Sequence, residues 1–465
     1  MKHTSESLTQ LVDQLMQRFE NIREPALRHR LISHSDLIPL IRRLEGLDDF
    51  DIREIGKSVE QRSIYRISVG NGPVPVLMWS QMHGNEPTAT MALFDLFRCL
   101  TLRGPLFEEL SSLLLANLTL HIIPMVNPDG AERFQLRNAL GIDLNRDSLA
   151  LQSPESQILM NQARSLKPTF GFNLHDQMRY HTPGLSPSPA ALTFLAPPVD
   201  YNGIIPQNRR HAMQVISGLS NYLTSHLPDR IGSYKDDYEP RAFGDQFQQL
   251  GISTILIESG GYEGDSEKMI PRKWNLASYL HALGSIASQV YKTESLDGYY
   301  NLRDNQRKYF DLIIRNATIR HGGIDIRADI AINNNEKLDS HRRRLVHTAV
   351  IEDLGDLKGF HGYQKYDAHG YLVSPGKVYI PEESYDALPP VTDLLRKGYT
   401  DIYLNHEPDS FKEKWRPLNV CSSVNELSES QLRINEPANL HFSDGQSTRM
   451  LVINGEIVDP DSVTV

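Results

Sequence analysis

The sequence predicts an α/β protein with more than one domain, and three observations support this. The chain has 465 residues, a length that favours two or more domains. Strand-like and helix-like apolar patterns alternate over residues 51–300, as in a mixed sheet with helices on both faces. From residue 305 to 465, short β-rich runs are separated by Gly, Asn and Asp turns. We therefore expect an α/β/α domain followed by an all-β, sandwich-like domain.

Residues 1–50 are expected to form a helical N-terminal extension. Residues 8–21 and 26–47 carry apolar side chains at helical spacing. Charges occur throughout the beginning of the chain, so it lacks the uninterrupted apolar core of a secretory signal. We expect these helices to pack on the α/β domain.

Charge and cysteine content exclude several classes of protein. The net charge of −10 at pH 7 argues against a general nucleic-acid binder. No apolar run reaches the roughly 18 residues of a membrane-spanning helix, so we expect no membrane partner. The two cysteines, Cys99 and Cys421, fall in different expected domains, which is typical of a reducing compartment without a disulfide framework. We expect a cytoplasmic location.

Polar residues suited to catalysis follow three expected strands of the α/β domain. The motif HGNE at 83–86, His175 and Glu258 each come shortly after an apolar run of strand length. Those runs cover residues 74–80, 169–174 and 253–257. In open α/β sheets, ligands bind at the carboxyl ends of the strands. The three segments could therefore meet at one site.

The residue types at these strand ends indicate a metal hydrolase. His83, Glu86 and His175 are a zinc ligand set that leaves a fourth position open. Glu258 is a separate carboxylate that can take a proton from a zinc-bound water. Each residue alone has a structural explanation, because HxxE is common by chance, His175 could be a satisfied polar residue, and Glu258 could cap a helix or form an ion pair. The combination, together with the segment 127–147, favours the metal site.

Several motifs, in a fixed order, resemble those of the zinc carboxypeptidase family typified by carboxypeptidase A. The resemblance covers roughly residues 52–290, and it implies a carboxypeptidase-like α/β/α fold with one Zn²⁺ per chain. The motifs are GKSVEQRSIY (56–65), HGNE (83–86), NPDG (127–130), GIDLNRD (141–147), LHDQ (174–177) and IESGG (257–261).

The resemblance implies a role for each matching residue. His83, Glu86 and His175 match the zinc ligands, and Glu258 matches the general base and acid. Asp143 matches the acid that holds the first zinc histidine in its tautomer.

The resemblance also implies the residues that bind substrate. Arg137 matches the arginine that polarises the scissile carbonyl, and Arg133 competes with it for this role. Asn145 and Arg146 match the pair that grips the substrate's terminal carboxylate, which suits the planar, charged guanidinium. The family also has a mobile tyrosine that closes over the substrate.

Two parts of the expected substrate site stay open. Tyr238 is our choice for the closing tyrosine, and Tyr234 is its rival. Residues 242–246 are expected to contribute to the specificity pocket, but a one-residue gap changes which side chain lies at its base.

The C-terminal region resembles the small β-sandwich of metal-dependent amidohydrolases. The intervening segment is too short for their catalytic barrel, which needs roughly 250 residues. We therefore expect a sandwich without its catalytic domain, used for packing, homo-oligomerisation or substrate access, and we expect His361 and His369 not to bind metal. The resembling runs are residues 311–319, 328–333, 366–376 and 450–458.

The leading expectation is a cytoplasmic zinc carboxypeptidase that hydrolyses the C-terminal peptide bond of peptides. One alternative is an N-acyl-amino-acid deacylase of the aspartoacylase and succinylglutamate desuccinylase branch, which shares the zinc motif. Another is a peptidase acting on cell-wall peptides. A non-catalytic binding protein is a fourth possibility, but all the expected catalytic positions are filled.

Overall fold

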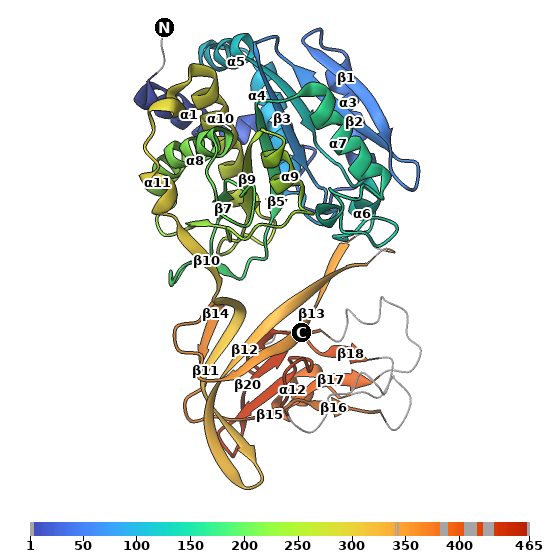
Figure 1. Cartoon of the computed structure of the whole chain (residues 1–465). Coiled ribbons are helices and arrows are strands. Elements are labelled where there is room, and N and C mark those ends of the chain that lie inside the picture. The colour runs from blue at the N-terminus through green and yellow to red at the C-terminus, as the bar shows by residue number, and fades with distance from the viewer. Residues whose placement is uncertain are drawn as a thin grey trace. The chain divides into compact units, whose positions relative to one another are not determined.

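The computed structural model describes residues 4–339, 341, 344–381, 389–403, 416–421 and 432–462. The chain divides into two compact units, which are residues 1–307 and residues 308–465. Figure 1 shows helices and a sheet together in the first unit and mainly strands in the second. Among the described residues, no helix is both long and apolar enough to span a bilayer.

The first unit is built on a mixed ten-stranded sheet in the order β1-β2-β4-β3-β5-β9-β7-β8-β10-β6. Strands β4, β3, β5 and β9 run parallel at its centre, and antiparallel pairs flank them. The strands are β1 (Phe50–Lys57), β2 (Ser63–Val69), β3 (Val74–Ser80), β4 (Leu118–Ile123), β5 (Phe170–Asp176), β6 (His181–Pro183), β7 (Leu192–Leu195), β8 (Ile231–Ser233), β9 (Ser253–Ser259) and β10 (Arg303–Arg307).

Helices cover both faces of this sheet (Figure 1), which confirms the expected α/β/α fold. The helices are α1 (Ser5–Met16), α2 (Phe19–Ile22), α3 (His34–Glu45), α4 (Thr88–Thr101), α5 (Pro105–Asn117), α6 (Pro128–Glu132), α7 (Pro154–Leu166), α8 (Gln207–His226), α9 (Phe243–Gln249), α10 (Met269–Ser288) and α11 (Asp297–Tyr300). Two short 3₁₀ turns, η1 (Leu144–Arg146) and η2 (Val290–Thr293), complete the unit.

Strand β3 shows how one sheet serves two cores. Val76 and Met78 pack into the core formed with α4, α8 and α10. Leu77 and Trp79 pack into the opposite core, which includes residues of α7 and α9. Side chains alternate between the two faces of a strand, so a strand buried on both faces reads as a continuous apolar run.

The N-terminal helices belong to the first unit. Arg272 of α10 and Asp95 of α4 form a fully buried ion pair with an N–O distance of 2.6 Å. The same guanidinium donates to the carbonyls of Glu24 and Leu27, so it fastens the N-terminal segment to the sheet-covering helices. The helix expected from residue 26 begins only at His34, because Ser33 forms a capping box there.

Strands β5 and β9 carry two residues of the expected site, His175 and Glu258. They are parallel neighbours, and His175 lies directly opposite Glu258 in their register. Phe172 and Leu174 of β5 point into the first core, so His175 points to the other face, and Glu258 points the same way. The short strand β7 is fully buried and pairs with β9 on its other side.

The second unit is rich in strands, as expected. Its eight-stranded sheet consists of β11 (Tyr309–His321), β12 (Ile324–Asp339), β13 (Arg344–Gly355), β14 (His361–Asp367), β15 (Leu372–Pro375), β19 (Leu440–Ser443), β20 (Thr448–Ile453) and β21 (Glu456–Val458). A separate parallel sheet consists of β16 (Lys377–Tyr379), β17 (Tyr399–Tyr403) and β18 (Asn419–Cys421).

The expectation of an all-β unit needs one correction. Helix α12 (Val391–Arg396) lies in the sequence between β16 and β17. Its residues Val391, Leu394 and Leu395 have helical spacing and bury against Ile402 of β17 and Leu451 of β20. Two parallel neighbouring strands need a crossover connection, which explains a helix at this point.

Candidate metal and catalytic site

Two glycines hold the HGNE loop against the NPDG loop. A Cβ atom on Gly84 would lie 2.0 Å from the carbonyl carbon of Gly130, so the two backbones touch. Asn127 donates to the carbonyl of Met82 at 3.1 Å and accepts from the amide of Gly130 at 2.8 Å. The NPDG motif therefore supports the loop that carries His83 and Glu86, and this explains why the two motifs occur together.

Three of the expected ligands converge on one point. The Nδ1 atom of His83 lies 2.8 Å from one carboxylate oxygen of Glu86, and the Nδ1 atom of His175 lies 2.8 Å from the other. Donor atoms of the three residues lie within 4.8 Å of one another. Glu86 and His175 are buried, and His83 is nearly so. The three side chains form a possible metal site, which we call the triad.

Asp143 orients the first histidine of the triad. Its carboxylate lies 3.1 Å from Nε2 of His83, the ring nitrogen that does not face Glu86. Burial by itself would lower the pKa of His83, but the charges of Glu86 and Asp143 outweigh it and raise that pKa to about 10. Burial by itself would raise the pKa of Glu86. The positive charges of His83 and His175 have the larger effect and lower that pKa. A proton and a metal ion would therefore compete for the ring nitrogens of His83.

Glu258 lies beside the triad, and its pKa is shifted in the opposite direction from that of Glu86. Burial, with the nearby charge of Glu86, raises its pKa well above the usual range. Among the described residues, none donates a hydrogen bond to its carboxylate. A buried carboxyl group with unused lone pairs and a raised pKa is suited to receive and return a proton.

The structure separates the two candidate tyrosines. The charge of Glu258, together with burial, raises the pKa of Tyr234 to about 12, while the side chain stays 38% exposed. Tyr238 instead packs edge-on against Tyr201 with ring centroids 4.7 Å apart, and its hydroxyl accepts from Gln249 at 2.5 Å. The amide of Tyr234 donates to the carbonyl of Phe194 at 2.9 Å, which ties Tyr234 to β7, the neighbour of β9.

Asn145 and Arg146 lie on the same side of the unit as the triad. Arg146 follows Asp143 in the same turn, its charge lowers the pKa of Asp143, and it lies 3.5 Å from Glu239. Its side chain is 44% exposed, so it can meet a ligand from solvent. The Oδ1 atom of Asn145 accepts from the amide of Phe243 at 3.0 Å, which leaves its amide nitrogen to donate.

The two candidate arginines for carbonyl polarisation have their side chains engaged with other groups than the triad. Arg137 is exposed and donates to the carbonyl of Gly141 at 3.0 Å, within a surface turn. Arg133 pairs with Glu60 and with the carbonyl of Asp129. Within the described part of the chain, neither arginine contacts the triad. The sequence motif could not indicate which group the Arg137 side chain contacts, because that contact depends on the turn around Gly141.

Sequence reasoning missed a charged group behind the triad. Lys268 precedes α10, and its ammonium group lies 3.3 Å from the carboxylate of Asp176, the residue after His175. Thr88 of α4 donates to the same carboxylate oxygen at 2.5 Å. The HDQ sequence showed an acid beside a ligand, but no local pattern linked it to a lysine on a distant loop.

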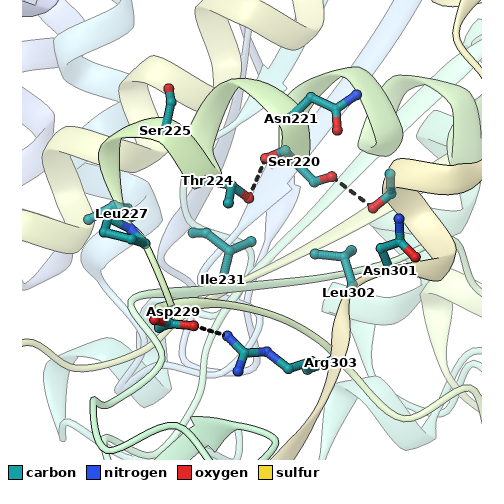
Figure 2. Close-up of a pocket in the computed structure, with 12 residues that line it drawn as sticks. Ser220, Asn221, Thr224, Ser225, Leu227, Asp229, Ile231, Asn301, Leu302 and Arg303 are labelled. Atoms are coloured by element: carbon teal, nitrogen blue, oxygen red, sulfur yellow. Dashed lines mark hydrogen bonds and ion pairs between the residues drawn. The ribbon is translucent and has the colours of Figure 1, made fainter.

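A cavity of about 480 Å³ lies apart from these residues. Figure 2 shows Ser220 and Thr224 of α8 on one side of it and the ion pair of Asp229 with Arg303 on another. None of the residues expected in the catalytic site lines this cavity.

The triad fits a zinc ion by its donor set. Two imidazole nitrogens and a carboxylate face one point, and the remaining nitrogen of His83 is held by an acid. Catalytic zinc sites combine three such protein ligands with an outer carboxylate on a ligating histidine.

Comparisons with known proteins agree with the sequence motifs. Residues 48–172 match the family described as zinc carboxypeptidase. The chain is 30% identical over 139 residues to carboxypeptidase SOL1 of Arabidopsis thaliana, covering 26% of this chain and 28% of that protein. It is 24% identical over 251 residues to carboxypeptidase D of Rattus norvegicus, covering 47% and 18% respectively.

The chain thus spans less than a third of the length of either relative. A solved metallo-carboxypeptidase from Burkholderia cenocepacia superposes with a TM-score of 0.46 and 18% identity, over 56% of this chain and 70% of that one. Over residues 48–172, the chain is thus similar to the zinc carboxypeptidase family.

Proposed function

We propose that this chain is a zinc-dependent carboxypeptidase that removes the C-terminal residue of a peptide. The observation that carries the proposal is the convergence of His83, Glu86 and His175 at one strand edge, with Glu258 opposite His175 in the sheet. A bound zinc ion supplies Lewis acidity, which polarises a carbonyl group and acidifies water. The family match and the position of Arg146 support the choice of reaction.

Glu258 moves the protons of the reaction. It accepts a proton from the attacking water as the carbon–oxygen bond forms, and it delivers that proton to the amine nitrogen as the carbon–nitrogen bond breaks. Its raised pKa suits the second half of this cycle, since a protonated carboxyl group must survive until the amine departs. Asp143 keeps the ring of His83 in the orientation that presents Nδ1 to the site.

Arg146 and Asn145 bind the terminal carboxylate of the peptide. The guanidinium offers parallel donors that match a carboxylate, and the free amide nitrogen of Asn145 adds a third. In the absence of substrate, Glu239 occupies Arg146 at 3.5 Å, a contact long enough to be exchanged for a closer one. We assign the closing tyrosine to Tyr234, because its phenol feels the charge of Glu258.

The N-acyl-amino-acid deacylase is the second candidate, and one observation favours it. The peptidase mechanism assigns Arg137 to the scissile carbonyl, but its guanidinium donates to the carbonyl of Gly141 within its own turn. A small acyl amino acid needs only the carboxylate clamp and the triad. We also propose the cytoplasmic location that the cysteine content predicts.

A mass-spectrometric assay tests the proposal. Zinc-loaded protein is incubated with a mixed library of short peptides, cell-wall peptides and N-acyl amino acids, beside a chelator-treated sample and the variant Glu258→Gln. Loss of single C-terminal residues that both controls abolish supports the carboxypeptidase. Cleavage confined to acyl amino acids transfers the chain to the deacylases. Stoichiometric zinc with no cleavage of any substrate contradicts both reactions and favours a binding protein.

A further inference from the structure

Lys268 occupies an unusual position behind the triad. It has a φ of +55° and a ψ of +33°, the left-handed region that is sterically unfavourable for a residue with a side chain. Its side chain is only 12% exposed. A long cationic side chain that is buried from a strained backbone position needs strong compensating contacts.

The compensating contacts all lie at the ends of β5 and β9. The ammonium group lies 3.2 Å from the carbonyl of Ser259, 3.2 Å from the carbonyl of Gln177, and 3.3 Å from the carboxylate of Asp176. Three donors thus meet three acceptors, so the charge is fully satisfied. The carbonyl of Ser259 also accepts from the amide of Gln177 at 2.9 Å, which continues the pairing of these two strands.

The backbone of Lys268 is itself firmly held. The carboxylate of Asp265 accepts from the amides of Met269 and Ile270 at 2.9 and 2.6 Å, which caps the first turn of α10. The carbonyl of Lys268 accepts the first hydrogen bond of that helix, from Arg272 at 2.9 Å. The ammonium group is therefore fixed to a helix that packs against the sheet.

We propose that Lys268 is a positioning residue that clamps the ends of β5 and β9 and so holds His175 and Glu258 at their working separation. The two strand ends carry these residues directly before the atoms that Lys268 grips. Asp176 extends the clamp, because its amide donates to Glu86 at 3.1 Å and its carboxylate accepts from Thr88. This role rests on the proposed hydrolase function of the same site.

Two substitutions isolate the ammonium group from the backbone. Lys268→Gly accommodates the left-handed conformation and removes the side chain, whereas Lys268→Met keeps the stem and removes the donors. Lys167 supplies a matched control, because it is a lysine with a φ of +46° that is exposed at the end of α7. Lys167→Gly changes the same residue type in the same backbone region, remote from the clamp's contacts.

Two readouts do not depend on turnover. Both Lys268 variants are expected to speed amide hydrogen exchange in residues 174–180 and to raise the zinc dissociation constant about 10-fold, the usual cost of losing support behind a ligand. Lys268→Arg is expected to restore most of the affinity, and Lys167→Gly to match the parent chain. If Lys268 acted through its charge alone, the variants should have a lower zinc dissociation constant, because removal of a nearby cation would tighten zinc binding. Unchanged exchange or tighter zinc therefore overturns the clamp.

Turnover provides the third readout. At saturating zinc, the Lys268 variants should lose about 10-fold or more in kcat while KM stays within about 2-fold, since Glu258 is displaced and Arg146 is not. Faster exchange with an unchanged kcat would reduce Lys268 to a stabilising contact and overturn the positioning role. Absence of hydrolysis in the parent chain would contradict the proposed function alone, and exchange and zinc affinity would then decide the clamp.

Discussion

Two buried carboxylates on parallel strands, one in each unit, serve different ends. Glu258 lies on β9 in the first unit, and Asp401 lies on β17 in the second. Asp401 accepts from Thr400 at 2.6 Å and from Asn419 and Asn439 at 2.9 Å each. Glu258 accepts from none of the described residues.

Burial raises the pKa of both carboxyl groups, so the neighbours make the difference. The lone pairs of Asp401 are taken by side chains of its own unit, which makes it a junction between strands. Glu258 keeps its lone pairs and faces the histidines of the triad. A buried acid thus indicates chemistry only where its hydrogen-bonding capacity is left unused beside other reactive groups.

The largest expected effect separates the two acids by activity. Glu258→Gln should lower kcat by about 10²–10⁴-fold, because the proton shuttle is lost, and leave zinc bound. Asp401→Asn, the matched change in the second unit, should leave the zinc-normalised kcat unaltered. Steady-state kinetics with metal analysis measures both. Equal losses of kcat in the two variants would contradict a difference in role between the two acids. Full activity of Glu258→Gln would show that Glu258 takes no part in the reaction.

For stability we expect the opposite ranking, with a larger effect at Asp401 than at Glu258. Asp401→Ala removes the acceptor of four side chains, those of Thr400, Asn419, Cys421 and Asn439, and should lower the local unfolding free energy of β17 and β18 by about 1–3 kcal/mol. Hydrogen exchange of the full chain, read at these strands, measures this. The control is Asp325→Ala, which removes an exposed ion pair with Arg320 and should change little. No loss at Asp401 would show that its hydrogen bonds are dispensable.

A smaller effect distinguishes the two candidates for the closing tyrosine. Tyr234→Phe should lower kcat/KM about 10-fold, the loss of one ordinary hydrogen bond to the substrate. Tyr238→Phe should stay close to the parent, because Tyr238 faces Tyr201 and Gln249. Kinetics on one peptide with both variants decides. A larger loss for Tyr238→Phe would reinstate the tyrosine favoured by sequence spacing.

The smallest expected effect is the number of protons that the triad releases when zinc binds. In the zinc-free chain, His83 has a pKa of about 10 and is charged at pH 8. Zinc binds neutral imidazole, so binding at pH 8 should release close to one proton. Titration calorimetry in buffers of different ionisation enthalpy measures the release. A heat of binding that is independent of the buffer would contradict a charged His83.

The same pKa has a consequence for the stability of the zinc-free chain. A folded-state pKa above the unfolded value of 6.5 stabilises the fold in full below pH 6.5. This contribution is lost as the pH rises through about 10. Zinc-free protein should therefore unfold more easily at pH 10 than at pH 7, and His83→Gln should reduce that difference.

Much of the first unit could be predicted from the sequence. The apolar runs at 74–80 and 253–257 are β3 and β9 within two residues, because strands buried on both faces leave a continuous local signal. The helix after Pro87 begins at Thr88 for a similarly local reason. Helix α12 was missed because its six residues carry too short a pattern.

By itself, the sequence determined the strands, the order of the motifs and the identity of the candidate ligands, since these depend on neighbouring residues. Only the tertiary structure decided that Arg137 donates to the carbonyl of Gly141, that Tyr234 feels the charge of Glu258, and that Lys268 binds both strand ends. These depend on side-chain direction and on contacts between segments far apart in the chain. No local periodicity carries that information, because the fold alone brings such residues together.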